Sequence, residues 1–191
     1  MSNWQIDSKE EIETIVSRTQ SGDVECFRLL VEKFQAEIFR MIIQQVGEYS
    51  VAEDLTQETF LKAFKYIKQF RAESSFKTWI TRIALNATNT YFSSRLYRRR
   101  ALQVPLDLKS HDLSSESYDM ETEQKLKLVR KALGELKVKY RSVVALCILQ
   151  QKSYQEAADI LGIPIGTVGS RLNTAIAMLN EHVGSLANES L

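Results

Sequence analysis

The sequence holds very few residues that break helices: two prolines and seven glycines among 191 residues. Proline inside a helix, and to a smaller degree glycine, costs free energy, so long stretches of this chain are free to be helical. Apolar residues recur mainly every three or four positions, which is the period of an amphipathic helix. The sequence therefore predicts an all-α fold, and no repeat of fixed period interrupts that pattern.

The composition is that of an ordinary globular protein, with 44% hydrophobic and 26% charged residues. The two cysteines, Cys26 and Cys147, lie far apart in sequence and are better explained as lone buried thiols than as a disulfide. The N-terminus is acidic, and no run of eighteen apolar residues occurs. We therefore expect a cytoplasmic protein that is neither exported nor inserted in a membrane by itself.

Charge is strongly segregated along the chain, although the net charge is only +1. Residues 1–61 hold five basic and twelve acidic residues, whereas residues 62–100 hold ten and one. Residues 101–124 are again acidic, with one against six, and residues 125–191 are mildly basic, with nine against five. Any one block could be a solvated helix face, but blocks this unequal favour separate partners of opposite charge.

The third, acidic block also predicts a domain boundary. It combines a proline with several serines and scattered acidic residues, and it shows no sustained apolar period. We therefore expect a first helical domain over residues 8–100, a flexible acidic linker over residues 101–121, and a second helical domain over residues 122–185.

Helix beginnings and ends can be read from capping signals. Serine followed three residues later by glutamate forms a capping box, and glycine commonly ends a helix. The boxes are Ser8 with Glu11, Ser50 with Glu53, and Ser153 with Glu156; the stops are Gly22 and Gly47. These signals predict first-domain helices at about 9–20, 23–46, 50–70 and 75–98.

The helix predicted at 50–70 carries Asp54, Gln57 and Glu58 at positions that share one face. Spacing alone favours a solvated polar face. The sharper alternative is a docking surface for a basic partner.

Residues 70–100 combine aromatic rings, amides and an arginine cluster. Arg82, Asn86, Asn89 and Ser93 fall on one face of the predicted helix, and an apolar stripe falls on another. Rings can stack on unpaired bases, for about 1–3 kcal/mol each. Most aromatic residues on a helix belong to the core, but the mixture favours binding of nucleic acid.

Residues 153–183 have the spacing of a helix-turn-helix, with Gly162 as the stop, Pro164 in the turn and Thr167 as the cap of the second helix. Helical hairpins without a DNA role show similar spacing. The second helix has Arg171 as its single arginine or lysine, so it should bind phosphate poorly.

Several separated stretches resemble the extracytoplasmic-function (ECF) group of bacterial RNA polymerase sigma factors. They cover about residues 20 to 180 and keep that family's order. The stretches are GDVECFRLLVEKF, AEDLTQETFLKAF, FRAESSFKTWITRIALNAT, YRSVVAL and SYQEAADILGIPIGTVGSRL. The resemblance implies two linked helical domains, the second with a helix-turn-helix, that bind core RNA polymerase and direct it to promoter DNA.

The resemblance also implies roles for individual residues. Core polymerase would be held through its β′ clamp helices and its β flap. The matching core-binding residues are Asp54, Gln57, Glu58 and Phe60. Those for the −10 element are Arg71, Lys77, Trp79, Arg82, Asn86, Asn89, Arg98 and Arg99, with Asn86 at a pocket for a flipped base. Those for the −35 element are Thr167, Ser170, Arg171, Asn173 and Thr174.

The leading hypothesis is therefore an alternative sigma factor, restrained by an anti-sigma factor that in this family is often anchored in the membrane. The competing hypothesis is a stand-alone helix-turn-helix regulator that binds duplex DNA without polymerase. Catalysis is disfavoured, because His111 and His182 are the only histidines and no phosphate-binding glycine loop occurs. We expect no metal and no cofactor.

Overall fold

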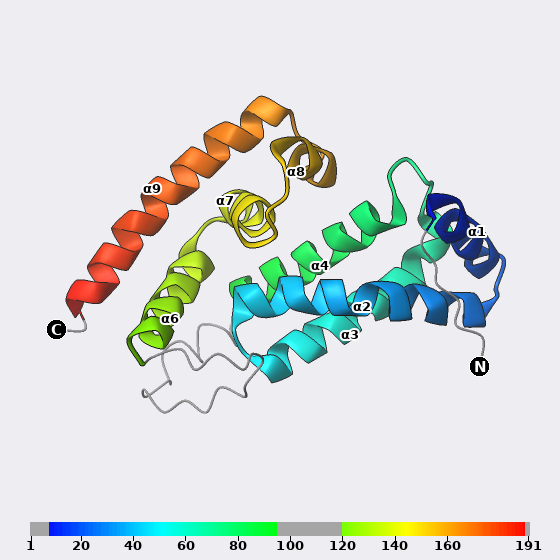
Figure 1. The fold of residues 1–191 in the computed structure, drawn as a ribbon, viewed down its shortest axis with the longest axis horizontal. Coiled ribbons are helices and arrows are strands. Elements are labelled where there is room, and N and C mark those ends of the chain that lie inside the picture. The colour runs from blue at the N-terminus through cyan, green and yellow to red at the C-terminus, as the bar shows by residue number, and fades with distance from the viewer. Residues whose placement is uncertain (1–7, 95–119, 190–191) are drawn as a thin grey trace.

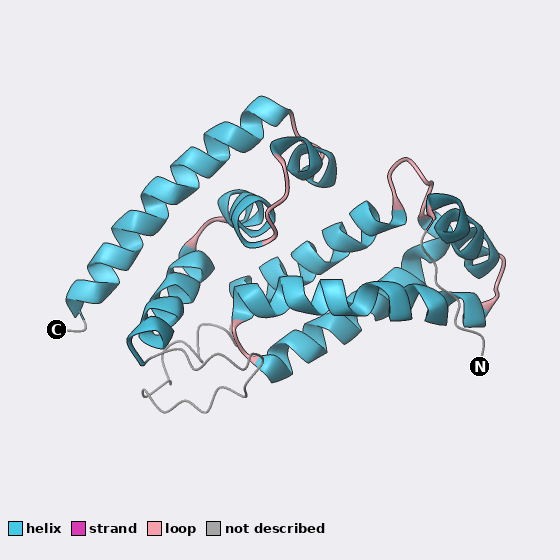
Figure 2. Cartoon of the chain, viewed as in Figure 1, coloured by secondary structure: helices cyan, strands magenta, loops and turns pink. Residues whose placement is uncertain are grey.

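The computed structural model describes residues 8–94 and 120–189, and within them every regular element is a helix, as predicted (Figure 2). The first unit comprises α1 (Lys9–Gln20), α2 (Val24–Val46), α3 (Tyr49–Tyr66), the short η1 (Ile67–Gln69) and α4 (Phe76–Ser93). The second unit comprises α6 (Met120–Glu135), α7 (Val138–Val144), the π-helical turn η2 (Ala145–Leu149), α8 (Tyr154–Leu161) and α9 (Ile165–Glu189). The predicted linker, 101–121, lies almost wholly outside the described residues.

In the first unit α2, α3 and α4 pack lengthwise, and α1 crosses one end of them (Figure 1). The fully buried Leu30, Ile42 and Ile80 form the centre of this core. The side-chain amide of Gln20 donates to the carbonyls of Ile67 and Phe70, at 2.9 and 2.7 Å. These bonds fix α1 against the turn that leads into α4.

The capping predictions hold at two of three sites. Complete capping boxes join Ser8 to Glu11 and Ser153 to Glu156. The box predicted at Ser50 is wrong, because Ser50 lies inside α3 and donates its hydroxyl to the Glu48 carboxylate, 3.1 Å away. Gly47 ends α2 with a left-handed φ of 74°, and α3 begins only two residues later. So short a connection leaves Ser50 in the first turn rather than at its cap.

The ends of α3 and α4 also differ from the predicted ones. The α-helix of α3 ends at Tyr66 and tightens into η1, although the sequence predicts helix to residue 70. α4 ends at Ser93, five residues before the predicted end, with Ser94 in extended conformation. The hydroxyl of Ser94 donates to the carbonyl of Tyr91 at 2.7 Å. Serine favours helix ends because its side chain competes for backbone groups in this way.

The second unit contains the predicted helix-turn-helix, formed by α8 and α9. Gly162 ends α8 with a left-handed φ of 65°, as expected. The predicted cap at Thr167 is wrong, because α9 begins at Ile165 and the amide of Thr167 already donates to the carbonyl of Pro164, at 2.9 Å. Proline suits the start of a helix because it has no amide to leave unpaired.

The core of the second unit is smaller than its apolar pattern suggests. Leu133, Leu136 and Val168 are buried as part of it. Leu126, Val129 and Ile148, which continue the apolar period along these helices, remain 38%, 42% and 46% exposed. Periodicity identified the helix faces but not how far another element covers them.

The two units lie against each other through α2 and α4 of the first and α6, α7, η2 and α8 of the second (Figure 1). Gln150 at the end of η2 donates its amide to the side-chain carbonyl of Gln44 on α2. α4 runs beside both α7 and α8, so the helix with the nucleic-acid signal also takes part in the contact between the units.

Candidate polymerase-docking and nucleic-acid surfaces

The polar face predicted on α3 is exposed. Asp54 and Gln57 lie open to solvent, and the Glu58 side chain, 45% exposed, pairs with Lys62 at 2.5 Å. The next turn adds Leu61, 70% exposed, and Phe64, 42% exposed. We call Asp54, Gln57, Glu58, Leu61 and Phe64 the docking surface.

Leu61 and Phe64 were not identified from the sequence, although a signal for Leu61 was present. Leu61 follows Gln57 by four residues and Asp54 by seven, so it lies on the same helical row. A leucine on an otherwise charged row contradicts a purely solvated face. Leu61 and Phe64 together leave apolar surface open to solvent beside Asp54.

Phe60 occupies a different place from that implied by the resemblance. It is only 7% exposed and belongs to the core of the first unit. It holds α3 against its neighbours rather than facing solvent.

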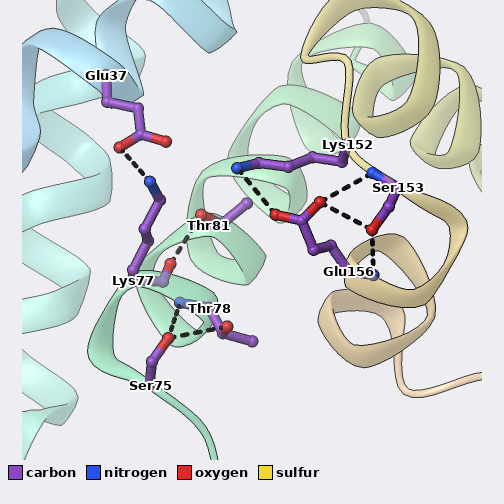
Figure 3. Close-up of polar contacts among 8 residues, drawn as sticks. All are labelled: Glu37, Ser75, Lys77, Thr78, Thr81, Lys152, Ser153 and Glu156. Atoms are coloured by element: carbon purple, nitrogen blue, oxygen red, sulfur yellow. Dashed lines mark hydrogen bonds and ion pairs between the residues drawn. The ribbon is translucent and has the colours of Figure 1, made fainter. Parts of the chain in front are cut away.

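At the start of α4 the predicted residues have partners within the protein. Lys77 reaches across to Glu37 of α2 at 2.8 Å (Figure 3). The Trp79 ring is half-buried against Phe70 and Phe76, with centroids 5.1 and 5.7 Å apart. Arg71 remains highly exposed, 4.0 Å from Glu73.

The polar face of α4, formed by Arg82, Asn86, Asn89 and Ser93, divides into a covered and an open part. Asn86 and Ser93 are exposed. Arg82 donates to two carbonyls of α8, and Asn89, only 7% exposed, bonds to residues of α7. The predicted Arg98 and Arg99 lie outside the described residues.

The candidate −35 residues lie on the outer side of α9. Ser170, Asn173 and Thr174 are exposed, whereas Thr167 and Arg171 are partly buried. The hydroxyl of Thr174 donates to the carbonyl of Ser170 at 2.9 Å, and that of Ser170 to the carbonyl of Thr167 at 3.2 Å. This face is therefore accessible but carries little positive charge.

A buried arginine at the junction of the units escaped the sequence reasoning. Arg141 of α7 is 3% exposed, and its guanidinium donates to the carbonyls of Leu133, Gly134 and Leu136 at 2.6 to 2.9 Å. It also lies over the Phe92 ring of α4, 4.5 Å from the centroid. The signal was an arginine one serine before the apolar run 143–146, where a charge needs buried partners.

In the described part of the chain, no three histidine, cysteine, aspartate or glutamate side chains gather as metal ligands, and no helix is long and apolar enough to span a bilayer. Burial raises the pKa of the Cys26 and Cys147 thiols, so both remain protonated at neutral pH.

The chain matches two protein families, one in the first helical unit and one in the second. Sigma-70 region 2 matches residues 30–98, and Sigma-70 region 4 matches residues 126–179. The ECF RNA polymerase sigma-E factor of Haemophilus influenzae is 29% identical over 91% of this chain and 96% of its own length. The RNA polymerase sigma-H factor of Pseudomonas aeruginosa is also 29% identical, over 96% of this chain and 99% of its own length.

Two solved structures have a similar fold. The sigma factor RpoE of Bartonella quintana, solved in complex with the anti-sigma factor NepR, is 27% identical with a TM-score of 0.55, covering 83% of this chain and 96% of its own. CnrH, solved in complex with the cytosolic domain of CnrY, is 22% identical with a TM-score of 0.61, covering 91% and 97%. With both sigma-70 regions matched and full-length relatives found, the chain belongs to the ECF group of sigma-70 RNA polymerase sigma factors.

Proposed function

We propose that this sigma factor holds core RNA polymerase through the docking surface of α3, reads the −10 strand with α4, and touches the −35 duplex with α9. The observation that carries this division is the exposure of the α3 row. That helix is buried on one side, and on the other it presents Asp54, Gln57 and Leu61 to solvent. The carboxylates of Asp54 and Glu58 beside an exposed leucine suit a partner surface that is basic with an apolar centre.

On α4 the exposed Asn86 is the proposed reader of a flipped base, since its amide both donates and accepts hydrogen bonds. One amide and a few rings do not offset the opening of several base pairs, at about 1.4 kcal/mol per stacking step. Promoter opening therefore requires polymerase as well, and the sigma factor alone should bind promoter DNA weakly.

We further propose that an anti-sigma factor covers the docking surface when the protein is inactive. The Bartonella quintana relative was solved with such a partner. A protein that masks Leu61 and Phe64 would compete directly with polymerase. The proposed role is binding and recognition rather than catalysis, in the cytoplasm where polymerase acts.

The docking assignment is tested by the double substitution Asp54→Ala with Glu58→Ala. We expect at least tenfold weaker competition for core polymerase, with unchanged helicity, because Asp54 is exposed and Glu58, whose side chain is 45% exposed, pairs with Lys62 of the same helix. Binding to core enzyme and far-ultraviolet circular dichroism provide the two readouts.

The matched control is Glu10→Ala with Glu13→Ala on α1, which removes the same charge from another exposed helix. It should compete as well as the parent. If the α3 pair competes equally well, the docking surface lies elsewhere. Tight binding of duplex DNA without polymerase would instead favour a stand-alone regulator.

A further inference from the structure

The last turn of α1 is tied to the chain that leads into α4 (Figure 1). The side-chain nitrogen of Gln20 donates to the carbonyl of Ile67 at 2.9 Å and to the carbonyl of Phe70 at 2.7 Å. The backbone amide of Phe70 also donates to the Ile67 carbonyl, at 3.0 Å. Gln20 therefore spans the short turn η1 from its first residue to the residue that follows it, and it uses both protons of its amide.

Gln20 is itself held in place by the end of its own helix. The carboxylate of Asp23 accepts from Nη2 of Arg18 at 2.7 Å and from the backbone amide of Cys26 at 3.3 Å. Thr19, the residue before Gln20, is only 3% exposed. Because the chain is anchored on both sides of Gln20, the side chain is a donor in a fixed position.

Phe70 connects this constraint to residues assigned to the −10 element. Its ring packs against the Trp79 ring of α4, with centroids 5.1 Å apart, and against the buried Phe76 ring, with centroids 6.1 Å apart. The next residue, Arg71, has a side chain that is 83% exposed. The position of Phe70 therefore decides where Arg71 leaves the fold and what the Trp79 ring rests on.

The loop between this turn and α4, residues 71–75, is held at both ends. Ser75 caps α4 by accepting from the amide of Thr78 at 3.1 Å, and Gln20 fixes the turn that precedes the loop. Within the loop Ala72 has a left-handed φ of 56°, a conformation that a residue with a Cβ keeps only where the surrounding structure holds it. Of the two anchors, Gln20 is the one supplied by another helix.

We propose that Gln20 is a positioning residue of the −10 surface: by holding the turn η1 in place, it presents Arg71 and Trp79 to the separated DNA strand in one fixed arrangement. The inference rests on the −10 role proposed for α4 and on the −10 assignment of Arg71. It adds a residue of α1 that acts through the loop and does not contact DNA itself. A cation that is already held in place loses less conformational entropy when it binds a phosphate, so its contact is stronger.

The test is a double-mutant cycle between Gln20 and Arg71, made with the full chain bound to core polymerase. The probe is a fluorescent fork-junction DNA with a single-stranded −10 element, taken from a promoter found by run-off transcription of genomic fragments. In the parent, Arg71→Ala should weaken binding about fivefold. In a Gln20→Met chain, whose side chain at 20 is of similar size but cannot donate, the same change should weaken binding less than twofold.

Two further variants separate positioning from stability. Gln20→Lys keeps an ammonium group that can donate to both carbonyls, so Arg71→Ala should again weaken binding about fivefold in that chain. Ile42→Val removes one methylene from the fully buried core of the same unit. It should lower the melting temperature and leave the effect of Arg71→Ala at its parent value.

The outcomes separate the positioning role from the −10 role. If Arg71→Ala weakens binding fivefold in the Gln20→Met chain as well, Gln20 does not position Arg71, although the −10 role stands. Loss of the Arg71 effect in Gln20→Lys or in Ile42→Val also overturns the proposal, because donated hydrogen bonds then do not explain it. If Arg71→Ala has no effect in the parent, the −10 assignment of Arg71 fails, and the positioning role fails with it. Loss of the effect in Gln20→Met alone supports the proposal.

Discussion

The two helices proposed to touch promoter DNA, α4 and α9, are opposite in character. α4 lies in the strongly basic part of the chain, yet Arg82 and Asn89 of its polar face are engaged by the second unit. α9 presents Ser170, Asn173 and Thr174 freely to solvent, yet Arg171 is its only arginine or lysine. The polar face of α4 has positive charge but is partly covered, whereas the exposed face of α9 has little positive charge. We therefore expect neither unit alone to bind promoter DNA tightly.

The largest effect is expected from Asn86→Ala on α4. Asn86 is the exposed amide of the polar face, and losing one bidentate base contact costs about 1–3 kcal/mol. We expect roughly a tenfold or greater loss of open complexes and a relaxed preference at one −10 base. The measurement is transcription from a promoter found by run-off transcription of genomic fragments with core polymerase.

The matched control is Thr90→Ala, one turn along α4. Thr90 is exposed, but its hydroxyl donates to the backbone carbonyl of Asn86, at 2.8 Å in the same helix. The hydroxyl is therefore not needed for a contact with DNA. Transcription by this variant should match the parent. If the two variants lose activity equally, general disturbance of α4 explains the result and the base-reading role is wrong.

A smaller effect should follow from adding charge to α9. Asn173→Lys with Thr174→Lys introduces cations on a face that is already exposed. We expect severalfold tighter binding of non-specific duplex DNA at low salt. The logarithm of affinity should also fall more steeply with salt, by roughly one slope unit for each new phosphate contact. An unchanged salt slope would mean that this face does not approach the DNA backbone.

Much of the contrast between α4 and α9 could be predicted from the sequence, because it depends on residues that are close together in the chain. The helix-turn-helix followed from Gly162 and the capping box at Ser153, and the low charge of α9 is visible in the residues themselves. The face holding Asp54 and Gln57 followed from helical spacing alone. Such features depend on residues within one or two turns of each other.

The covering of α4 could not be predicted, because it depends on residues far apart in the chain. Arg82 and Asp159 are 77 positions apart, and Asn89 and Ser142 are 53 apart. Nothing local marks Arg82 as a partner for backbone carbonyls rather than phosphates, since both are oxygen acceptors. The burial of Arg141 and Phe60 was missed for the same reason: tertiary packing, not spacing, decides which side of a helix meets another element.

The smallest effect is expected on the stability of α8, the helix that precedes α9. Ser153→Ala removes the N-cap of α8, and we expect the second unit to lose about 1 kcal/mol of unfolding free energy. The alanine variant keeps the backbone amide of residue 153, which lowers the pKa of Glu156, so the stabilisation from the ionised carboxylate is complete above the carboxyl's ordinary value of 4.5 and is lost as pH falls through the lowered pKa. Thermal melts of the parent and of Glu156→Gln should therefore converge in acid, whereas a difference that stays constant with pH would contradict a role for the ionised carboxylate.

The most direct measurement is photocrosslinking in an initiation complex assembled on a promoter that this protein recognises. Benzoylphenylalanine replaces Leu61 of the docking surface in one variant and Thr90, beside Asn86, in another; both positions are exposed. We predict that the probe at 61 labels the polymerase and the probe at 90 labels the separated non-template strand. Labelling of DNA from position 61, or of polymerase alone from position 90, would contradict the assignment of the two helices.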